Sequence, residues 1–435
     1  MKPVRIDVPV LSGKAVGAFL ERLETRRART PDAVQDKVRS ILADVRKRGD
    51  DALYDCTFRF DGIDLRSSGL RVSRENVEKA FQTVPKAFVG VLEKAAANIR
   101  RFHEKDKPGS WMSWEADGVV LGRRTMPLER VGLYVPGGRA AYPSSLLMAA
   151  VPAQVAGVPE IVVVSPPDRL GNVHPSILCA ARVLGLQEIY RIGGAQAVGA
   201  LAFGTKTVTP VDKIVGPGNV YVAEAKRQVF GVVDIDMVAG PSEVVLVADG
   251  SSDPSFVAAD MLAQAEHDPS ASSVCLTHSR TAAHRIRKAL TTQAESLKRK
   301  TVLLASLRDW GAILITRSLD ESLSLANRLA PEHLGLHVVD PWTALADVRH
   351  AGAVFLGGYS PETVGDYWAG PNHILPTNRT ARFGSPLGTA DFMKHSNVIQ
   401  YTEKAINRNA SDIIAFARTE GLDGHAEAVR RRTKK

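Results

Sequence analysis

The sequence predicts an α/β protein with two doubly wound, Rossmann-like parallel-sheet domains, a helical N-terminal segment and a short C-terminal helical tail. At 435 residues the chain exceeds what one hydrophobic core usually serves, so at least two packed units are expected. From residue 119 onward, short β-branched runs alternate with helical stretches. Such βαβ alternation gives parallel strands joined by right-handed crossovers.

The first hundred residues are predicted to be mainly helical. An apolar stripe runs along residues 31–48 until Gly49 ends that helix. A second helical block covers residues 73–104, and residues 107–110 have the composition of a linker. We interpret this region as scaffold.

The next part of the chain predicts the first parallel sheet. Its strand-like runs are residues 130–135, 161–164, 189–192 and 213–215. Each is followed by a loop of small residues that opens a helix, at 136–138, 166–167, 193–196 and 216–219. Ligands of open parallel sheets bind at such strand ends, and helix N-termini suit phosphates. The G-x-G-x-x-G fingerprint is absent, however, and glycine turns are equally typical of α/β proteins that bind no nucleotide.

A second α/β unit follows. Its expected strands are residues 244–247, 274–277, 313–316, 336–339 and 354–356, and its expected helices are residues 255–266, 282–294, 321–329 and 343–349. The predicted division is an N-terminal helical segment (1–28), a discontinuous first α/β domain with most metal and catalytic residues (29–133 and 244–385), a second α/β domain on the nucleotide side (134–243) and a C-terminal tail (386–435).

Composition and charge narrow the function classes. The longest apolar run, residues 146–158, is broken by Pro152 and is too short to cross a bilayer, and the N-terminus lacks an apolar signal core, so a cytoplasmic protein without membrane contact is expected. The net charge of +9 comes mostly from scattered basic residues without interleaved aromatics, which argues against nucleic-acid binding. The three cysteines are far apart and predict buried thiols, neither disulfides nor a thiolate zinc site.

One helical stretch carries a possible ligand set. Asp260, Gln264 and His267 recur at i, i+4 and i+7, which places three polar groups on one face. Taken alone, such a stripe is more typical of a solvated surface with a histidine at a helix C-terminus. Small-residue and Glu-His segments before and after it, at 239–243 and 331–333, favour a site instead.

Further candidates lie near the ends of predicted elements. Pro331 ends a helix, so Glu332 and His333 should fall in the turn before the strand at 336–339, where a carboxylate beside an imidazole is a candidate acid/base pair. A set of nitrogen and oxygen ligands without sulfur fits zinc in an open, reactive site, or manganese or cobalt. The candidate ligands are Gln264, His267, Asp366 and His425.

Eight segments together resemble the histidinol dehydrogenase family, over essentially the full chain. They are GLYVPGG at 132–138, YPSS at 142–145, GGAQ at 193–196, DKIVGPGN at 212–219, AGPSE at 239–243, QAEHD at 264–268, APEHL at 330–334, and GD at 365–366 with NHILP at 372–376.

The resemblance implies an NAD-dependent, zinc-containing homodimer with shared active sites. It implies the oxidation of L-histidinol through L-histidinaldehyde to L-histidine, the last step of histidine biosynthesis, with one Zn²⁺ per subunit and NAD⁺ as acceptor. Glu332 and His333 would be the acid/base residues. The implied zinc ligands are Gln264, His267, Asp366 and His425, which also contact substrate together with Ser242, His333, His373 and Glu420. The implied NAD contacts are Tyr134, Gln196 and Asn219, and Glu420 and His425 would come from the partner subunit.

Three alternatives are weighed against this function. The first is a paralogous zinc- and NAD-dependent dehydrogenase of another small alcohol, such as a sulfonated diol. A pocket made anionic by Asp366 and Glu420 suits the ammonium of histidinol better than a sulfonate. The second is a zinc hydrolase that uses Glu332 and His333 without nucleotide. The third is a basic nucleic-acid-binding protein that depends on residues 430–435.

Overall fold

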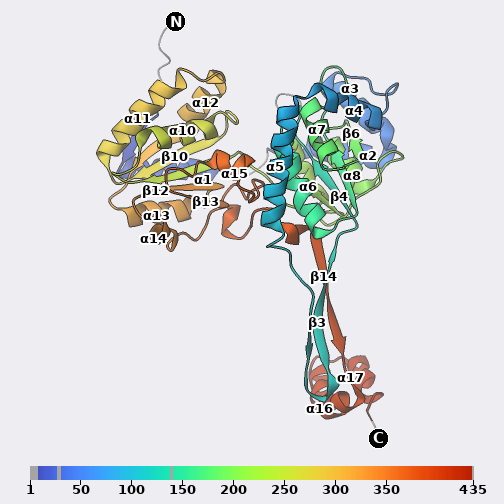
Figure 1. The fold of residues 1–435 in the computed structure, drawn as a ribbon. Helices are drawn as coiled ribbons and strands as arrows, with labels where there is room; N and C mark the ends of the chain where they lie inside the picture. Colours follow the sequence, from blue (N-terminus) through green and yellow to red (C-terminus); the bar gives the residue numbers. More distant parts are fainter. Residues whose placement is uncertain (1–7, 27–30, 138–140, 434–435) are drawn as a thin grey trace.

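A computed structural model describes residues 8–26, 31–137 and 141–433. It has two α/β lobes side by side and a thin extension that carries the C-terminal helices away from them (Figure 1). We call the lobes the five-stranded lobe and the six-stranded lobe after their sheets. Among the described residues, none of the helices is both long and apolar enough to cross a membrane.

The five-stranded lobe contains a parallel sheet of order β6-β5-β4-β7-β8. The chain starts in the middle strand and winds outward in both directions, so the predicted doubly wound topology is confirmed. The strands are β4 (Arg130–Tyr134), β5 (Glu160–Val164), β6 (Glu188–Tyr190), β7 (Lys213–Val215) and β8 (Asp234–Ile235). The connecting helices are α6 (Pro143–Ala156), α7 (Pro175–Val183), α8 (Gly194–Phe203) and α9 (Val220–Val229).

Four N-terminal helices complete the two faces of this sheet. They are α2 (Asp32–Arg48), α3 (Asp50–Asp61), α4 (Arg74–Thr83) and α5 (Lys86–His103). Apolar residues of α4 and α5 share one core with α6 and α7, and those of α2 and α3 share the other with α8 and α9. This packing corrects the predicted division, which grouped residues 29–133 with 244–385. The stripe on each helix shows that it covers a sheet, but not which one.

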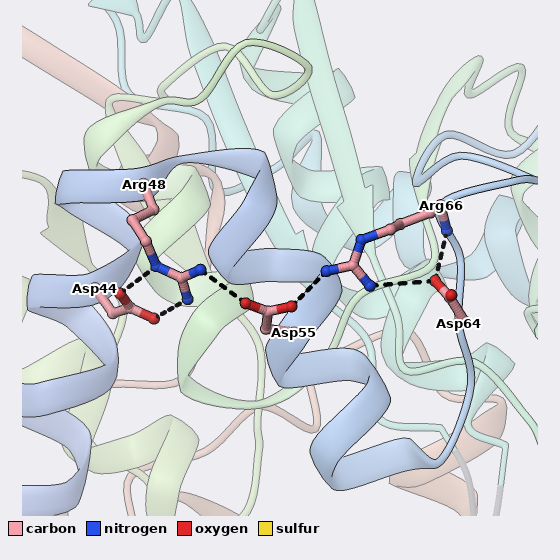
Figure 2. A network of polar contacts seen from close by, with 5 residues as sticks. All are labelled: Asp44, Arg48, Asp55, Asp64 and Arg66. Carbon is pink, nitrogen blue, oxygen red and sulfur yellow. Dashed lines mark hydrogen bonds and ion pairs between the residues drawn. The ribbon is translucent and has the colours of Figure 1, made fainter.

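A network of ion pairs fastens α2 to α3 at the surface (Figure 2). The guanidinium of Arg48 binds Asp44 at 2.6 Å and Asp55 at 2.7 Å, and Arg66 joins Asp55 to Asp64. The hydrogen bonds to Arg48 lower the pKa of both Asp44 and Asp55. These side chains are more than one-third exposed, so water screens the pairs and they add little to the stability of the fold.

The six-stranded lobe has a parallel sheet of order β1-β11-β10-β9-β12-β13. Its strands are β1 (Val10–Ser12), β9 (Glu243–Ala248), β10 (Ser272–Thr277), β11 (Gly311–Ile315), β12 (His333–His337) and β13 (Ala353–Leu356). One face is covered by α10 (Pro254–Ala265), α11 (Arg280–Ala294) and α12 (Lys300–Trp310), the other by α1 (Lys14–Arg26), α13 (Leu319–Leu329) and α14 (Pro341–Leu345). A short helix, α15 (Glu362–Tyr367), follows β13. The N-terminal segment, expected to be helical, also supplies the edge strand β1.

The extension is a three-stranded antiparallel sheet, which we call the ribbon. It consists of β2 (Trp111–Trp114), β3 (Val120–Pro127) and β14 (Met393–Gln400), in the order β14-β3-β2. It carries α16 (Glu403–Thr419) and α17 (Asp423–Arg430) at its far end (Figure 1). Short 3₁₀ turns lie at Ala116–Gly118, Thr380–Arg382 and Thr389–Phe392. The predicted tail began at 386, but Leu387 and Phe392 still pack in the core of the five-stranded lobe.

Candidate active site

Helix α10 presents the first part of the site. Asp253 caps it by accepting the Ser255 N–H at 2.8 Å. Gln264, near its end, is only 1% exposed, and neither atom of its carboxamide has a hydrogen-bond partner among the described residues. Asp260 lies one turn earlier, but its carboxylate is occupied by His337 Nε2 at 3.0 Å. Gln264 is therefore the buried polar group of this helix that needs a ligand.

Helix α15 brings two carboxylates to the end of α10. One ligand atom each of His267, Glu362 and Asp366 lies within 4.8 Å of the other two. Burial raises the pKa of Asp366 to about 6. It also raises the pKa of Glu362 well above its usual range, with the charges of Asp366, Asp260 and Glu332 acting in the same direction. Buried carboxylates grouped in this way favour a bound cation or a proton.

Glu362 is the site residue that sequence reasoning missed. It is not among the candidate residues predicted from the sequence, yet it precedes Asp366 by four residues on α15, so the two side chains share a face. That spacing was the signal available in the sequence.

The start of β12 and the residue before it supply the candidate acid/base pair. His333 was expected in a turn three residues before a strand, but it is the first residue of β12. Ala330 adopts a left-handed conformation (φ 45°) that ends α13, so the strand can begin directly after Pro331 and Glu332. His333 is therefore fixed by strand geometry, Glu332 lies directly before the strand, and both side chains are buried.

The two side chains are held by the same peptide segment. His333 Nδ1 lies 3.2 Å from the Glu243 carbonyl, to which it can only donate, and the Glu243 N–H donates to Glu332 Oε2 at 2.9 Å. Burial lowers the pKa of His333 to about 3, with lesser effects from His267 and His373, so its ring is neutral. Nε2 is then the basic nitrogen, and no described residue offers it a hydrogen bond. It lies 3.9 Å from Asp366 Oδ1 and faces the carboxylate cluster.

Two connections between the lobes complete the site. Ser242, just before β9, hydrogen-bonds Glu332, and burial nevertheless raises the pKa of that carboxyl well above its usual range. His373 lies 3.0 Å, through Nδ1, from the Asp366 carbonyl, and burial lowers its pKa to about 4. The two connections touch where the Gly240 N–H donates to Thr377 Oγ1 at 2.6 Å. Residues from α10, α15, β12 and both connections thus meet in one place.

The candidate nucleotide residues lie at or after the carboxyl ends of β4, β6 and β7. The Tyr134 hydroxyl accepts the Gly194 N–H at 3.0 Å, and burial raises its pKa to about 12. Gln196 is buried, and its Oε1 has no partner within the described parts of the chain. Asn219 caps α9, because its Oδ1 accepts the N–H groups of Tyr221 and Val222 at 3.0 and 3.2 Å. Only the NH₂ of Asn219 is therefore left for a ligand. Gly138, in the neighbouring predicted loop, lies outside the described residues.

This arrangement can be compared with known proteins. The family model described as histidinol dehydrogenase matches residues 24–433. A histidinol dehydrogenase of Halalkalibacterium halodurans is 51% identical over 398 residues, which cover 92% of this chain and 93% of the relative. The Bacillus subtilis enzyme of the same name is 48% identical over 417 residues, 95% of this chain and 97% of the relative. The chain belongs to the histidinol dehydrogenase family.

A solved structure supports the fold assignment. A histidinol dehydrogenase from Elizabethkingia anophelis superimposes with a TM-score of 0.92 at 35% sequence identity, covering 98% of both chains. The predicted α/β class is confirmed, and so is the predicted function class, an oxidoreductase acting on a CH–OH group of a small molecule. The alternative of a dehydrogenase for another alcohol is not favoured.

The tail residues stand apart from this site in the histidinol dehydrogenase fold. Glu420 follows α16 and His425 lies in α17, both on the surface, and Figure 1 shows these helices beyond the ribbon, far from α10 and α15. A single chain therefore does not bring Glu420 and His425 to Gln264, His267 and Asp366.

Proposed function

We propose that this protein oxidises L-histidinol through L-histidinaldehyde to L-histidine in two NAD-dependent steps, at a zinc site between α10 and α15. The observation that carries the proposal is the cluster of His267, Glu362 and Asp366, which faces the free Nε2 of His333 and lies beside the unpartnered carboxamide of Gln264. A metal site next to a buried neutral base is suited to removing a hydroxyl proton.

The donor set fits zinc. Gln264, His267 and Asp366 offer oxygen and nitrogen atoms, and a cation among them would relieve the repulsion between buried carboxylates. These three residues would hold the ion together with His425 of the partner subunit. Glu362 adjoins them and adds negative charge that favours a divalent cation.

The five-stranded lobe fits a dinucleotide. Gln196 and the NH₂ of Asn219 are buried or loop-end polar groups with free hydrogen-bonding capacity, and Tyr134 fixes the Gly194 backbone between them. The site lies at the carboxyl ends of parallel strands, where open sheets bind nucleotides.

Different residues of the chain carry out the proton transfers of the two steps. When bound, zinc would hold the ring and amino nitrogens of the substrate, and NAD⁺ would accept the hydride. His333 Nε2 takes the proton of the alcohol in the first step. Glu332, aimed by the Glu243 N–H and Ser242, helps water add to the aldehyde: its carboxyl gives a proton to the carbonyl oxygen as it takes one from the water, which gives the hydrate oxidised in the second step. His373 and the partner subunit's Glu420 would contact the substrate.

The tail supports a homodimer with shared sites. Trp114, Ile399 and Phe416 leave large apolar side chains exposed on the ribbon and α16, as expected of a surface that meets another protein. A second copy that places its tail over this chain's site would supply Glu420 and His425. The acidic pocket suits the ammonium group of histidinol, and neither nucleic acid nor a membrane has a role in the reaction.

The test is NADH absorbance after purified protein is mixed with L-histidinol. We expect two NADH per histidine, with little turnover of amino alcohols that lack imidazole or of sulfonated diols. One NADH with released aldehyde would refute the two-step reaction, and turnover of histidinol ester without nucleotide would favour a hydrolase.

A further inference from the structure

A buried pair of opposite charges lies behind the candidate nucleotide site. Lys226 is on α9, and Asp236 follows β8; their side chains are in contact and only 2% and 1% exposed. Neither residue has a part in the proposed chemistry. Taking two charges out of water is costly, and a buried pair often stabilises a protein no more than packed apolar residues would. Its presence therefore calls for a reason other than stability.

Both charges bind one glycine. Lys226 Nζ donates to the Gly216 carbonyl at 2.9 Å, while Asp236 Oδ2 accepts the Gly216 N–H at 2.8 Å. The backbone donor and acceptor of Gly216 are thus each satisfied by a charged group, and charge-assisted hydrogen bonds are stronger than neutral ones. The peptide groups on either side of Gly216 are fixed in orientation.

Gly216 opens the loop that is the candidate nucleotide loop, residues 216–219. Its φ is +113°, and a Cβ there would come within 2.1 Å of the Tyr134 carbonyl oxygen. Only glycine therefore lets the loop approach the end of β4 this closely. At its other end Asn219 caps α9. The ion pair and the cap thus hold the loop at both ends, and the cap uses only the Oδ1 of Asn219.

The same carboxylate also holds the connection to the other lobe. Asp236 Oδ1 accepts the N–H of Met237 at 2.6 Å. Met237 begins the segment that leads through Gly240 to Ser242 and β9. The pair therefore also anchors the start of the connection that leads to the metal site.

We propose that Lys226 and Asp236 are positioning residues for dinucleotide binding: they set the loop 216–219 against the end of β4 in the conformation that receives NAD. They act through Gly216 and Asn219 and do not touch the ligand themselves. This inference rests on the proposed NAD dependence of the enzyme.

The same two strands offer a matched control. Lys213 in β7 pairs with Asp234 in β8 at 2.9 Å, and the Lys213 side chain is 8% exposed. That pair lies at the amino ends of the strands, away from the loop, whereas Lys226 and Asp236 act at their carboxyl ends. Lys213→Met and Lys226→Met thus remove a buried lysine charge from opposite ends of one strand pair.

The experiment measures NADH affinity by fluorescence titration of the full-length, zinc-loaded protein, with KM values and melting temperatures for both variants. We expect Lys226→Met to weaken NADH binding and raise the KM for NAD by about tenfold or more, with the KM for histidinol within about twofold of wild type. Lys213→Met should lower the melting temperature to a similar extent and leave NADH affinity unchanged.

Unchanged NADH affinity in folded Lys226→Met, or equal losses in both variants, would overturn the proposal. If Lys226→Met does not fold, Asp236→Asn serves instead, because the amide keeps an oxygen for one backbone N–H. Asp236→Asn should still weaken NADH binding several-fold, and an unchanged affinity refutes the proposal. If the wild-type protein binds no NADH, the proposed function fails instead, which is a distinct result.

Discussion

Mixing two inactive chains, one carrying His267→Ala and the other His425→Ala, should restore activity. His267 follows α10 in the six-stranded lobe, whereas His425 lies in α17 at the far end of the ribbon. Strand β14 has 8 residues, so at about 3.3 Å per residue it carries the tail roughly 26 Å from the lobes. A chain's own tail is thus held away from its own metal cluster, and a symmetric partner can supply it.

The size of the recovery follows from symmetry. Equal amounts of two chains that exchange at random give about half heterodimers, and each heterodimer has one site with both lesions and one site with neither. About one site in four is then intact, so the mixture should reach about a quarter of wild-type NADH formation. A mixture of wild type with His267→Ala should reach about half with or without exchange, because every chain in it carries His425, and it gives the reference level for that quarter.

Native mass spectrometry of tagged chains confirms that subunits have exchanged. No recovered activity in an exchanged mixture would mean that His425 serves its own chain or no site at all. Recovery well above a quarter would mean that the doubly altered site retains function, which contradicts the ligand assignment.

Three further predictions test other residues. His333→Asn should slow oxidation of both histidinol and added histidinaldehyde by about 10²–10⁴, whereas Glu332→Gln should slow aldehyde oxidation more than alcohol oxidation; equal losses would contradict the division of roles. His267→Ala should lose zinc, measured by atomic absorption, while circular dichroism remains near wild type, and full zinc occupancy would refute its assignment as a ligand. Burial raises the pKa of Asp61 from 3.8 to about 6, so its ionisation disfavours the folded state above pH 6 and has no effect below pH 3.8. At about 1.36 kcal/mol per pH unit this is about 3 kcal/mol, which partial exposure reduces to about 1–2 kcal/mol. Asp61→Asn should therefore raise the melting temperature by about 1–4 °C at pH 8 and leave it unchanged at pH 4, and an equal gain at both would exclude this cause.

The two parallel sheets could be predicted because their signals are local. Runs such as 213–215 and 354–356 alternate with amphipathic helices, and this pattern alone defines a doubly wound sheet. The ribbon could not be predicted, because Val120–Pro127 pairs with Met393–Gln400 across more than half of the chain. Neither segment contains a sequence signal that identifies the other as its pairing partner.

The site was predicted only in part, because only some of its signals are local in the sequence. Gln264 and His267 are three residues apart at the end of one predicted helix, and Glu332 and His333 are neighbours in sequence. Their buried environment, which makes His333 neutral and Glu332 hard to ionise, arises only when segments from different parts of the chain meet. Lys226 resembles any lysine of a polar helix until the fold buries it against the end of a neighbouring strand.

The proposed dimer would make protein concentration a determinant of the ribbon's stability. A thin sheet of three strands is marginal unless its apolar residues are covered, and here Trp114 and Ile399, which lie on opposite faces, are 76% and 71% exposed in the single chain. A second copy that covers these side chains binds only the folded ribbon. Its binding therefore stabilises the folded ribbon by an amount that depends on protein concentration, as a ligand would. Once the protein is dilute enough to dissociate, each further tenfold dilution should remove about 1.4 kcal/mol of this support. The ribbon should then fray first, as increased hydrogen exchange and proteolysis of residues 111–127 while both lobes remain protected.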